Sequence, residues 1–212
     1  MNRKLLILDV DETLVHGALQ PLDRFPDHVC DWCYLYKCPH VERFMDFCRQ
    51  HFRVAVWPSA SVDHIRVCLD QICPPDYPFE FVWGKERCTE VLDDPDDYGR
   101  GERFRWRKNL RKVKTRHGVD LGQVIMVDDS PEKLDRHYGN LVQIKPFSGD
   151  PNDRELLRLM PYLLELKQIE NIRSVEKRGW AQRFPIDAGA PAQPNTAKGR
   201  ETPRNSATRR ET

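Results

Sequence analysis

Residues 4–15 carry the sequence K-L-L-I-L-D-V-D-E-T-L-V, which decides the fold of the chain. Leu5 to Leu8 form an unbroken apolar run, too short for an isolated helix and typical of a strand buried on both faces of a parallel sheet. Asp9 and Asp11 follow directly, and residues two apart in an extended chain lie on the same side. Ligands in open α/β sheets bind at the carboxyl ends of strands, so this pair predicts a phosphoryl-transfer site. An ordinary acidic turn is the alternative.

The composition favours one soluble domain without a strong charge bias. The chain has 212 residues, of which 39% are hydrophobic, and this is enough for one sizeable core. The 34 Lys and Arg residues balance 33 Asp and Glu residues, so the charge gives no reason to expect a nucleic acid or membrane partner. We find no apolar run typical of a signal peptide or membrane span and expect a cytoplasmic protein. Seven cysteines, an odd number, favour reduced thiols over a disulfide framework.

The rest of the chain alternates between short buried runs and segments with helical spacing. Further strands are expected at residues 53–57, 79–83, 123–129 and 141–144. Helices are expected from Pro39, at 62–72, at 108–114, from Ser130 to about Tyr138, and from Asp150 onward. This alternation predicts an α/β fold, a doubly wound parallel sheet whose first strand lies between the second and the fourth. Residues 16–37 and 86–107 lack such a period and are expected to be loops.

Polar side chains follow three of these strands. The two acids end the first strand, the turn from Pro58 to Ser61 follows the second, and Asp128 with Asp129 ends the fourth. We expect the three strand ends to converge on one crevice. A hydroxyl-rich turn before a helix is typical of an anion site, although plain helix capping explains Ser59 and Ser61 equally well.

A group of potential soft metal ligands lies in the first loop. Cys30, Cys33, Cys38 and His40 fall within eleven residues, a spacing that can close a tetrahedral zinc shell. A redox C-x-x-C pair or plain buried cysteines are the alternatives.

The C-terminal part of the chain changes in composition. Past about Ser174 the apolar pattern thins, and from Pro185 onward Pro, Ala, Asn, Thr and Arg predominate. Such a composition cannot bury enough apolar surface to offset the entropy of the chain. We expect one domain over residues 1–170 and an extension over 171–212 that is flexible from about 185.

Four motifs resemble those of haloacid dehalogenase (HAD)-type phosphatases: D-V-D-E-T-L from Asp9, W-P-S-A-S from Trp57, K-N-L-R-K-V from Lys108 and D-D-S-P from Asp128. The segments L-Y-K-C-P-H-V-E-R-F, V-A-V-W and E-R-C-T resemble more closely the branch with the phosphatases of the RNA polymerase II C-terminal domain and their small Nuclear-LIM-interactor-type bacterial relatives. The resemblance covers about Leu5 to Leu166 and implies a HAD-like Rossmannoid fold. No segment is long enough for a separate cap domain.

The resemblance also implies catalytic roles. Asp9 would attack phosphorus and form an aspartyl-phosphate, while Asp11 would protonate the leaving oxygen and then deprotonate the attacking water. Lys108 would bridge the phosphate and the acids. The family usually has a phosphate-binding Thr or Ser where this chain has Pro58. Either Ser59 or the following backbone amides, beginning with that of Ala60, would bind the phosphate instead, or phosphate binding would be weaker than is usual in the family.

A magnesium ion is the implied cofactor. The Asp9 carboxylate, the Asp11 carbonyl and a carboxylate of Asp128 or Asp129 would supply hard oxygen ligands. In this branch we expect Asp129 to touch the metal and Asp128 to support it. A second departure is Cys38, which stands where the branch usually has Arg before Pro.

The expected open site suits a phosphorylated macromolecule better than a small metabolite. We therefore expect a protein serine/threonine phosphatase. A nucleic-acid end phosphatase and a catalytically weak phosphate-binding scaffold are the alternatives. Arg87 and the cluster from Arg103 to Arg107 either contact the flanks of the substrate or form a solvated basic loop. Nothing in the sequence specifies an oligomeric state.

Overall fold

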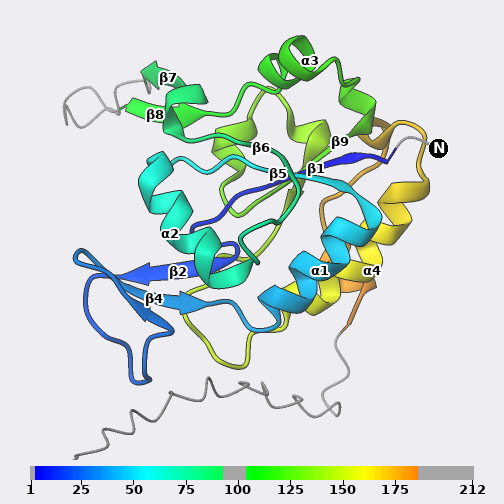
Figure 1. Ribbon diagram of the computed structural model, residues 1–212. Helices are drawn as coiled ribbons and strands as arrows, with labels where there is room; N and C mark the ends of the chain where they lie inside the picture. Colours follow the sequence, from blue (N-terminus) through cyan, green and yellow to red (C-terminus); the bar gives the residue numbers. More distant parts are fainter. Residues whose placement is uncertain (1–2, 93–103, 186–212) are drawn as a thin grey trace, which may run out of the picture.

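The computed structural model describes residues 3–92 and 104–185, and its centre is a five-stranded parallel sheet (Figure 1). The strand order is β10-β9-β1-β5-β6. These strands are β1 (Leu5–Leu8), β5 (Arg53–Val56), β6 (Phe79–Val82), β9 (Val124–Asp128) and β10 (Leu141–Gln143). β1 therefore lies between β5 and β9, the second and fourth strands predicted from the sequence. This confirms the predicted position of the first strand.

Helices cover both faces of this sheet, which explains why β1 is apolar throughout. Leu6 and Leu8 are fully buried in a core with α1 (Val41–His51), α2 (Val62–Ile72) and α4 (Glu155–Gln168). Leu5 and Ile7 are fully buried in a second core on the opposite face, with α3 (Arg111–His117). In Figure 1, α1 and α4 lie together on one side and α3 on the other. Alternating side chains of one strand thus serve two cores.

Three helix boundaries differ from the sequence prediction. α3 begins at Arg111 and not at Lys108, because Lys108 is drawn inward by a hydrogen bond from its N–H to the Lys133 carbonyl (2.7 Å). The segment after Ser130 forms two 3₁₀ turns, η3 (Pro131–Leu134) and η4 (Tyr138–Asn140), instead of one helix. α4 begins only at Glu155, after turns that Asp150 and Asp153 stabilise by accepting backbone N–H groups.

The predicted loop at residues 16–37 is wrong in part, because it contains most of a small antiparallel sheet. Its strands are β2 (Val15–Ala18), β3 (His28–Val29) and β4 (Tyr34–Lys37), in the order β2-β4-β3. Leu35 and Tyr36 are fully buried and anchor β4 to the main core. Strands of two to four residues are too short to show an alternating period in the sequence.

The predicted loop at residues 86–107 also needs correction at its ends. β7 (Thr89–Leu92) pairs antiparallel with β8 (Phe104–Arg107), and η1 (Lys85–Arg87) precedes them. The intervening residues 93–103, which include the expected exposed acidic and glycine stretch, lie outside the described residues.

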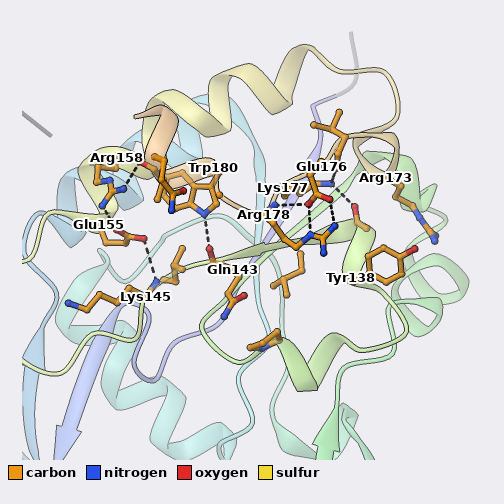
Figure 2. A pocket seen from close by; sticks show the side chains of 18 of the residues that line it. Tyr138, Gln143, Lys145, Glu155, Arg158, Arg173, Glu176, Lys177, Arg178 and Trp180 are labelled. Atoms are coloured by element: carbon orange, nitrogen blue, oxygen red, sulfur yellow. Dashed lines mark hydrogen bonds and ion pairs between the residues drawn. The ribbon is translucent and has the colours of Figure 1, made fainter. Parts of the chain in front are cut away.

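The first part of the C-terminal extension packs on the domain. η5 (Ile172–Ser174) and α5 (Trp180–Arg183) carry Ile172, which is fully buried, and Trp180, which is 4% exposed. The Trp180 ring stacks on Tyr162, with ring centroids 5.2 Å apart, and its Nε1 donates to the Gln143 carbonyl of the edge strand β10 at 2.7 Å. Figure 2 shows this contact beside a pocket of about 960 Å³ between the extension and β10. The tail expected from about residue 185 lies beyond the described residues.

Among residues 3–92 and 104–185, every helix is too short or too polar to cross a bilayer.

Candidate active site

Asp9 lies where β1 ends and is 1% exposed. Its Oδ1 accepts a hydrogen bond from the Val10 N–H at 2.9 Å. Its Oδ2 lies 3.1 Å from Lys108 Nζ and 3.0 Å from Lys133 Nζ. Burial disfavours the ionised carboxylate, but the two lysine charges outweigh burial and lower the pKa of Asp9. Asp9 is therefore an ionised, fixed carboxylate, which is what a nucleophile requires.

Three carboxylates meet at the ends of β1 and β9. Ligand atoms of Asp9, Asp128 and Asp129 all lie within 4.8 Å of one another. Asp128 is fully buried, and its Oδ2 accepts from Lys108 Nζ at 2.6 Å while its Oδ1 accepts from the Ser130 N–H at 2.9 Å. Burial and the charge of Asp9 raise the pKa of Asp128 to about 7. The part of the sequence prediction that brings Asp9 together with Asp128 and Asp129 is confirmed.

Asp129 supplies the observation that bears on a metal. Its Oδ1 is buried and makes no hydrogen bond to any described residue, while its Oδ2 accepts from Ser130 Oγ at 3.1 Å. A buried carboxylate oxygen without a hydrogen-bond donor is costly unless a cation compensates it, and the Lys133 ammonium, at 4.0 Å, is beyond hydrogen-bond distance. With two neighbouring carboxylates in reach, the residues present fit a hard divalent cation such as Mg²⁺.

Lys108 lies where the sequence prediction expected it, between the acids and the start of α3. Its side chain is fully buried and bridges Asp9 and Asp128. Two negative charges therefore compensate the one buried ammonium group.

Lys133 is a site residue that the sequence analysis missed. It lies on η3, and its Nζ is 3.0 Å from Asp9 Oδ2, 3.7 Å from Asp128 Oδ1 and 4.0 Å from Asp129 Oδ1. Burial opposes its charge, but the carboxylates outweigh burial and raise the pKa of Lys133. Only its position five residues after Asp128 hinted at this role, since a short turn there can fold the side chain back to the strand end.

The Asp11 side chain is not one of the three clustered carboxylates and lies beside His64 and Cys68 instead. Its Oδ1 lies 2.7 Å from His64 Nε2, and this hydrogen bond outweighs burial and raises the pKa of His64. Asp11 lines a cavity of about 720 Å³ together with Ser59, Ala60 and the exposed Trp32, among others. The two acids of the first motif thus face different environments, a buried charged cluster for Asp9 and an open cavity for Asp11.

The turn after β5 brings its residues to the same cavity. Ser59 and Ala60 line the cavity beside Asp11, as predicted, and Ser59 Oγ is buried near the Cys88 thiol. Ser61 is the N-cap of α2, and its Oγ accepts from the His64 N–H at 3.4 Å. The capping alternative is therefore correct for Ser61, whereas Ser59 lines the cavity without capping α2. Pro58, which precedes them, is buried.

Glu12 is a further acid that the sequence analysis did not single out. It has a left-handed backbone (φ 56°), which is uncommon for a residue other than glycine. Burial, followed by the charges of Asp11, Asp129 and Asp9, raises the pKa of Glu12 to about 7.

The possible zinc group in the first loop does not assemble. Cys30, Cys33, Cys38 and His40 are all described, yet they are absent from the groups of side chains close enough to share a metal ion. The Cys30 N–H donates to the Cys33 carbonyl in a tight turn, whereas Cys38 is buried in the main core. All seven cysteines are free thiols.

Two arginines of the predicted substrate-reading cluster are engaged within the chain. Arg105 and Arg107 both form ion pairs with Asp135, at 3.1 and 2.6 Å. Arg87 lies over the Trp83 ring at 5.8 Å. Arg103 lies outside the described residues.

Comparisons with known proteins identify the family. The model of the NLI interacting factor-like phosphatase family matches residues 4–173. The chain belongs to this family. It is accordingly a HAD-type phosphatase, a phosphoric monoester hydrolase, as the sequence motifs indicated.

Two curated relatives carry similar sequences over more than half of their length. CTD nuclear envelope phosphatase 1 of Xenopus laevis is 27% identical over 197 residues, covering 86% of this chain and 75% of the relative. The human CTD small phosphatase-like protein is 27% identical over 187 residues, covering 84% and 61%. Among solved structures, a fission yeast RNA polymerase II CTD phosphatase matches with a TM-score of 0.48 and 14% identity, over 85% of this chain and 54% of that one.

Proposed function

We propose that this phosphatase hydrolyses phosphoserine or phosphothreonine in proteins through an aspartyl-phosphate on Asp9, with Mg²⁺ as cofactor. The observation that carries the proposal is the convergence of an ionised, buried Asp9 with Asp128, Asp129 and the fully buried Lys108. The names of the relatives, which include a CTD nuclear envelope phosphatase and a CTD small phosphatase-like protein, support a phosphorylated protein as the substrate.

The reaction has two steps, each assigned to a carboxylate. An Asp9 oxygen attacks phosphorus while the bond from phosphorus to the ester oxygen breaks, and Asp11 gives its proton to that oxygen. Water then attacks the aspartyl-phosphate and passes a proton to Asp11, which releases phosphate and restores both acids. Lys108 offsets negative charge beside the transferred group.

Asp9, Asp129 and the Asp11 carbonyl would hold the magnesium ion, with Asp128 supporting them from behind. The positive charge of the magnesium ion would allow an anionic nucleophile to approach an anionic ester. The buried Asp129 Oδ1 without a hydrogen-bond donor supports this assignment.

The shape of the site supports a macromolecular substrate. The cavity beside Asp11 is open and is lined by two exposed indoles, Trp32 (52% exposed) and Trp106 (37% exposed), among others. An open cavity lined by aromatic side chains can accommodate the chain on either side of a phosphorylated residue, whereas a small metabolite needs enclosure.

A substrate panel with one inactive variant tests the proposal. Wild-type protein should hydrolyse phosphoserine or phosphothreonine peptides with Mg²⁺ and lose activity in chelator. Asp9→Asn should lower kcat by at least about 10³-fold with the fold intact by circular dichroism. Asp70→Asn, an exposed acid on α2, is the matched control. Unchanged turnover of Asp9→Asn would refute the nucleophile, and a preference for phosphorylated oligonucleotides that falls steeply with salt would refute the protein substrate.

A further inference from the structure

A chain of hydrogen bonds holds the Asp11 carboxylate. His64 Nε2 lies 2.7 Å from Asp11 Oδ1, and Trp32 Nε1 lies 3.4 Å from His64 Nδ1. The three side chains come from the loop after β1, from α2 and from the small antiparallel sheet, and all three line the same cavity. Parts of the fold that are distant in sequence therefore meet at the acid that faces the leaving group.

The chemistry of indole sets the direction of these hydrogen bonds. An indole N–H can only donate, so the His64 Nδ1 that faces Trp32 accepts. A neutral imidazole then carries its proton on Nε2, and this N–H donates to Asp11 Oδ1. One oxygen of Asp11 is thereby fixed, and the other is left to exchange a proton with the substrate.

His64 also contacts neighbouring residues of α2. Its backbone N–H donates to the N-cap Ser61 Oγ, and the Cys68 thiol, one turn later, lies 3.5 Å from the ring atom Nε2. The His64 side chain is 20% exposed and that of Asp11 is 29% exposed, so the pair lies in the cavity wall and not in the core. A fixed donor at the edge of a cavity suits the orientation of a reactive group better than the stabilisation of a core.

We propose that His64, oriented by Trp32, is a positioning residue that keeps Asp11 on the leaving-group side of the cavity. The inference rests on the proposed role of Asp11 as the acid–base group. A carboxylate that is free to rotate spends less time in hydrogen-bond reach of the leaving oxygen, and proton transfer requires that reach. The loss of His64 therefore weakens protonation of the leaving group while nucleophilic attack by Asp9 remains.

Aryl phosphates with different leaving groups test this role. We expect His64→Ala to lower kcat/KM by about 10- to 100-fold on phenyl phosphate, a poor leaving group that needs an acid. On dinitrophenyl phosphate, whose leaving group needs no proton, the loss should stay below about threefold. His64→Gln should recover most of the activity on phenyl phosphate, because its amide nitrogen can donate to Asp11. Asp70→Ala, on the same helix, should follow the wild type on both substrates.

A double variant shows whether His64 acts through Asp11. In an Asp11→Asn background, His64→Ala should add no further loss on phenyl phosphate, because the group that it positions is already gone. An equal loss on good and poor leaving groups, or a full additional loss in the double variant, would overturn the positioning role. Failure of the proposed function looks different, since Asp9→Asn would then retain turnover of both aryl phosphates.

Discussion

Removal of Lys133 should destabilise the metal-free protein and strengthen metal binding. The Lys133 ammonium lies within 4.0 Å of all three clustered carboxylates, where it compensates charge that a divalent cation would otherwise compensate. We propose Lys133→Met, which keeps the apolar stem and removes only the charge. The lysine and a metal ion compete for the same oxygens, so the variant should respond to metal more strongly than the wild type.

The magnitude follows from the burial of the pair. Removing one partner of a buried ion pair costs about 3–5 kcal/mol. Lys133 is 21% exposed, and Asp128, with its raised pKa, can take up a proton, so we expect a loss of about 2–3 kcal/mol. For a domain of this size the loss corresponds to a fall in Tm of roughly 5–10 °C in chelator. The same free energy no longer opposes metal binding, so the Kd for Mg²⁺ should fall by roughly 30- to 150-fold.

Thermal unfolding in chelator and with increasing MgCl₂, together with titration calorimetry, measures both effects. Lys114→Met, at an exposed lysine of α3, is the matched control and should leave Tm and Mg²⁺ affinity unchanged. Wild-type stability of Lys133→Met in chelator, or an unchanged Mg²⁺ affinity, would refute the competition between ammonium and metal.

Three further predictions concern single side chains. Glu12→Gln in chelator should be more stable than the wild type above about pH 7 and equally stable below about pH 5. Because the pKa of Glu12 in the folded state is raised to about 7, ionising this side chain costs folding free energy as the pH rises. The difference should reach only about 1 kcal/mol, since the Glu12 side chain is 41% exposed. Trp180→Phe should lower the free energy of unfolding by about 1–3 kcal/mol in urea titrations, because it leaves the Gln143 carbonyl without its donor. The Asp135 side chain is 29% exposed, and hydrogen bonds and charge from two arginines outweigh burial and lower its pKa. Asp135→Asn should therefore be destabilised at about pH 7, and the difference from the wild type should shrink as the pH falls below the ordinary pKa of aspartate; a difference that does not change with pH would contradict the ion pairs.

The sequence predicted the parts of the site that lie at the ends of central strands. Asp9, Asp128 and Asp129 follow unbroken apolar runs that predict buried strands, and neighbouring parallel strands place their carboxyl ends at the same edge of the sheet. Lys108 was predictable only through the resemblance to a family, because a basic run is ordinarily solvated surface. The central sheet order followed from the alternation of strands and helices.

The remaining site residues are positioned by turns and tertiary contacts, which leave no hydrophobic periodicity in the sequence. Lys133 reaches the acids from a 3₁₀ turn that stands in place of the expected helix. His64 lies on α2 as an unremarkable polar residue until β1 and α2 are packed together. The small antiparallel sheet that carries Trp32 has strands of two to four residues, which leave no pattern to detect.

The contact between Trp180 and Gln143 has a consequence for where the folding unit ends. The family match stops at residue 173, yet the chain from there to α5 shields one border of the central sheet. An uncovered edge strand exposes unpaired backbone N–H and C=O groups that can pair with another protein chain, which promotes aggregation. A protein shortened to the matched region would therefore keep all the proposed active-site residues but would be prone to aggregate.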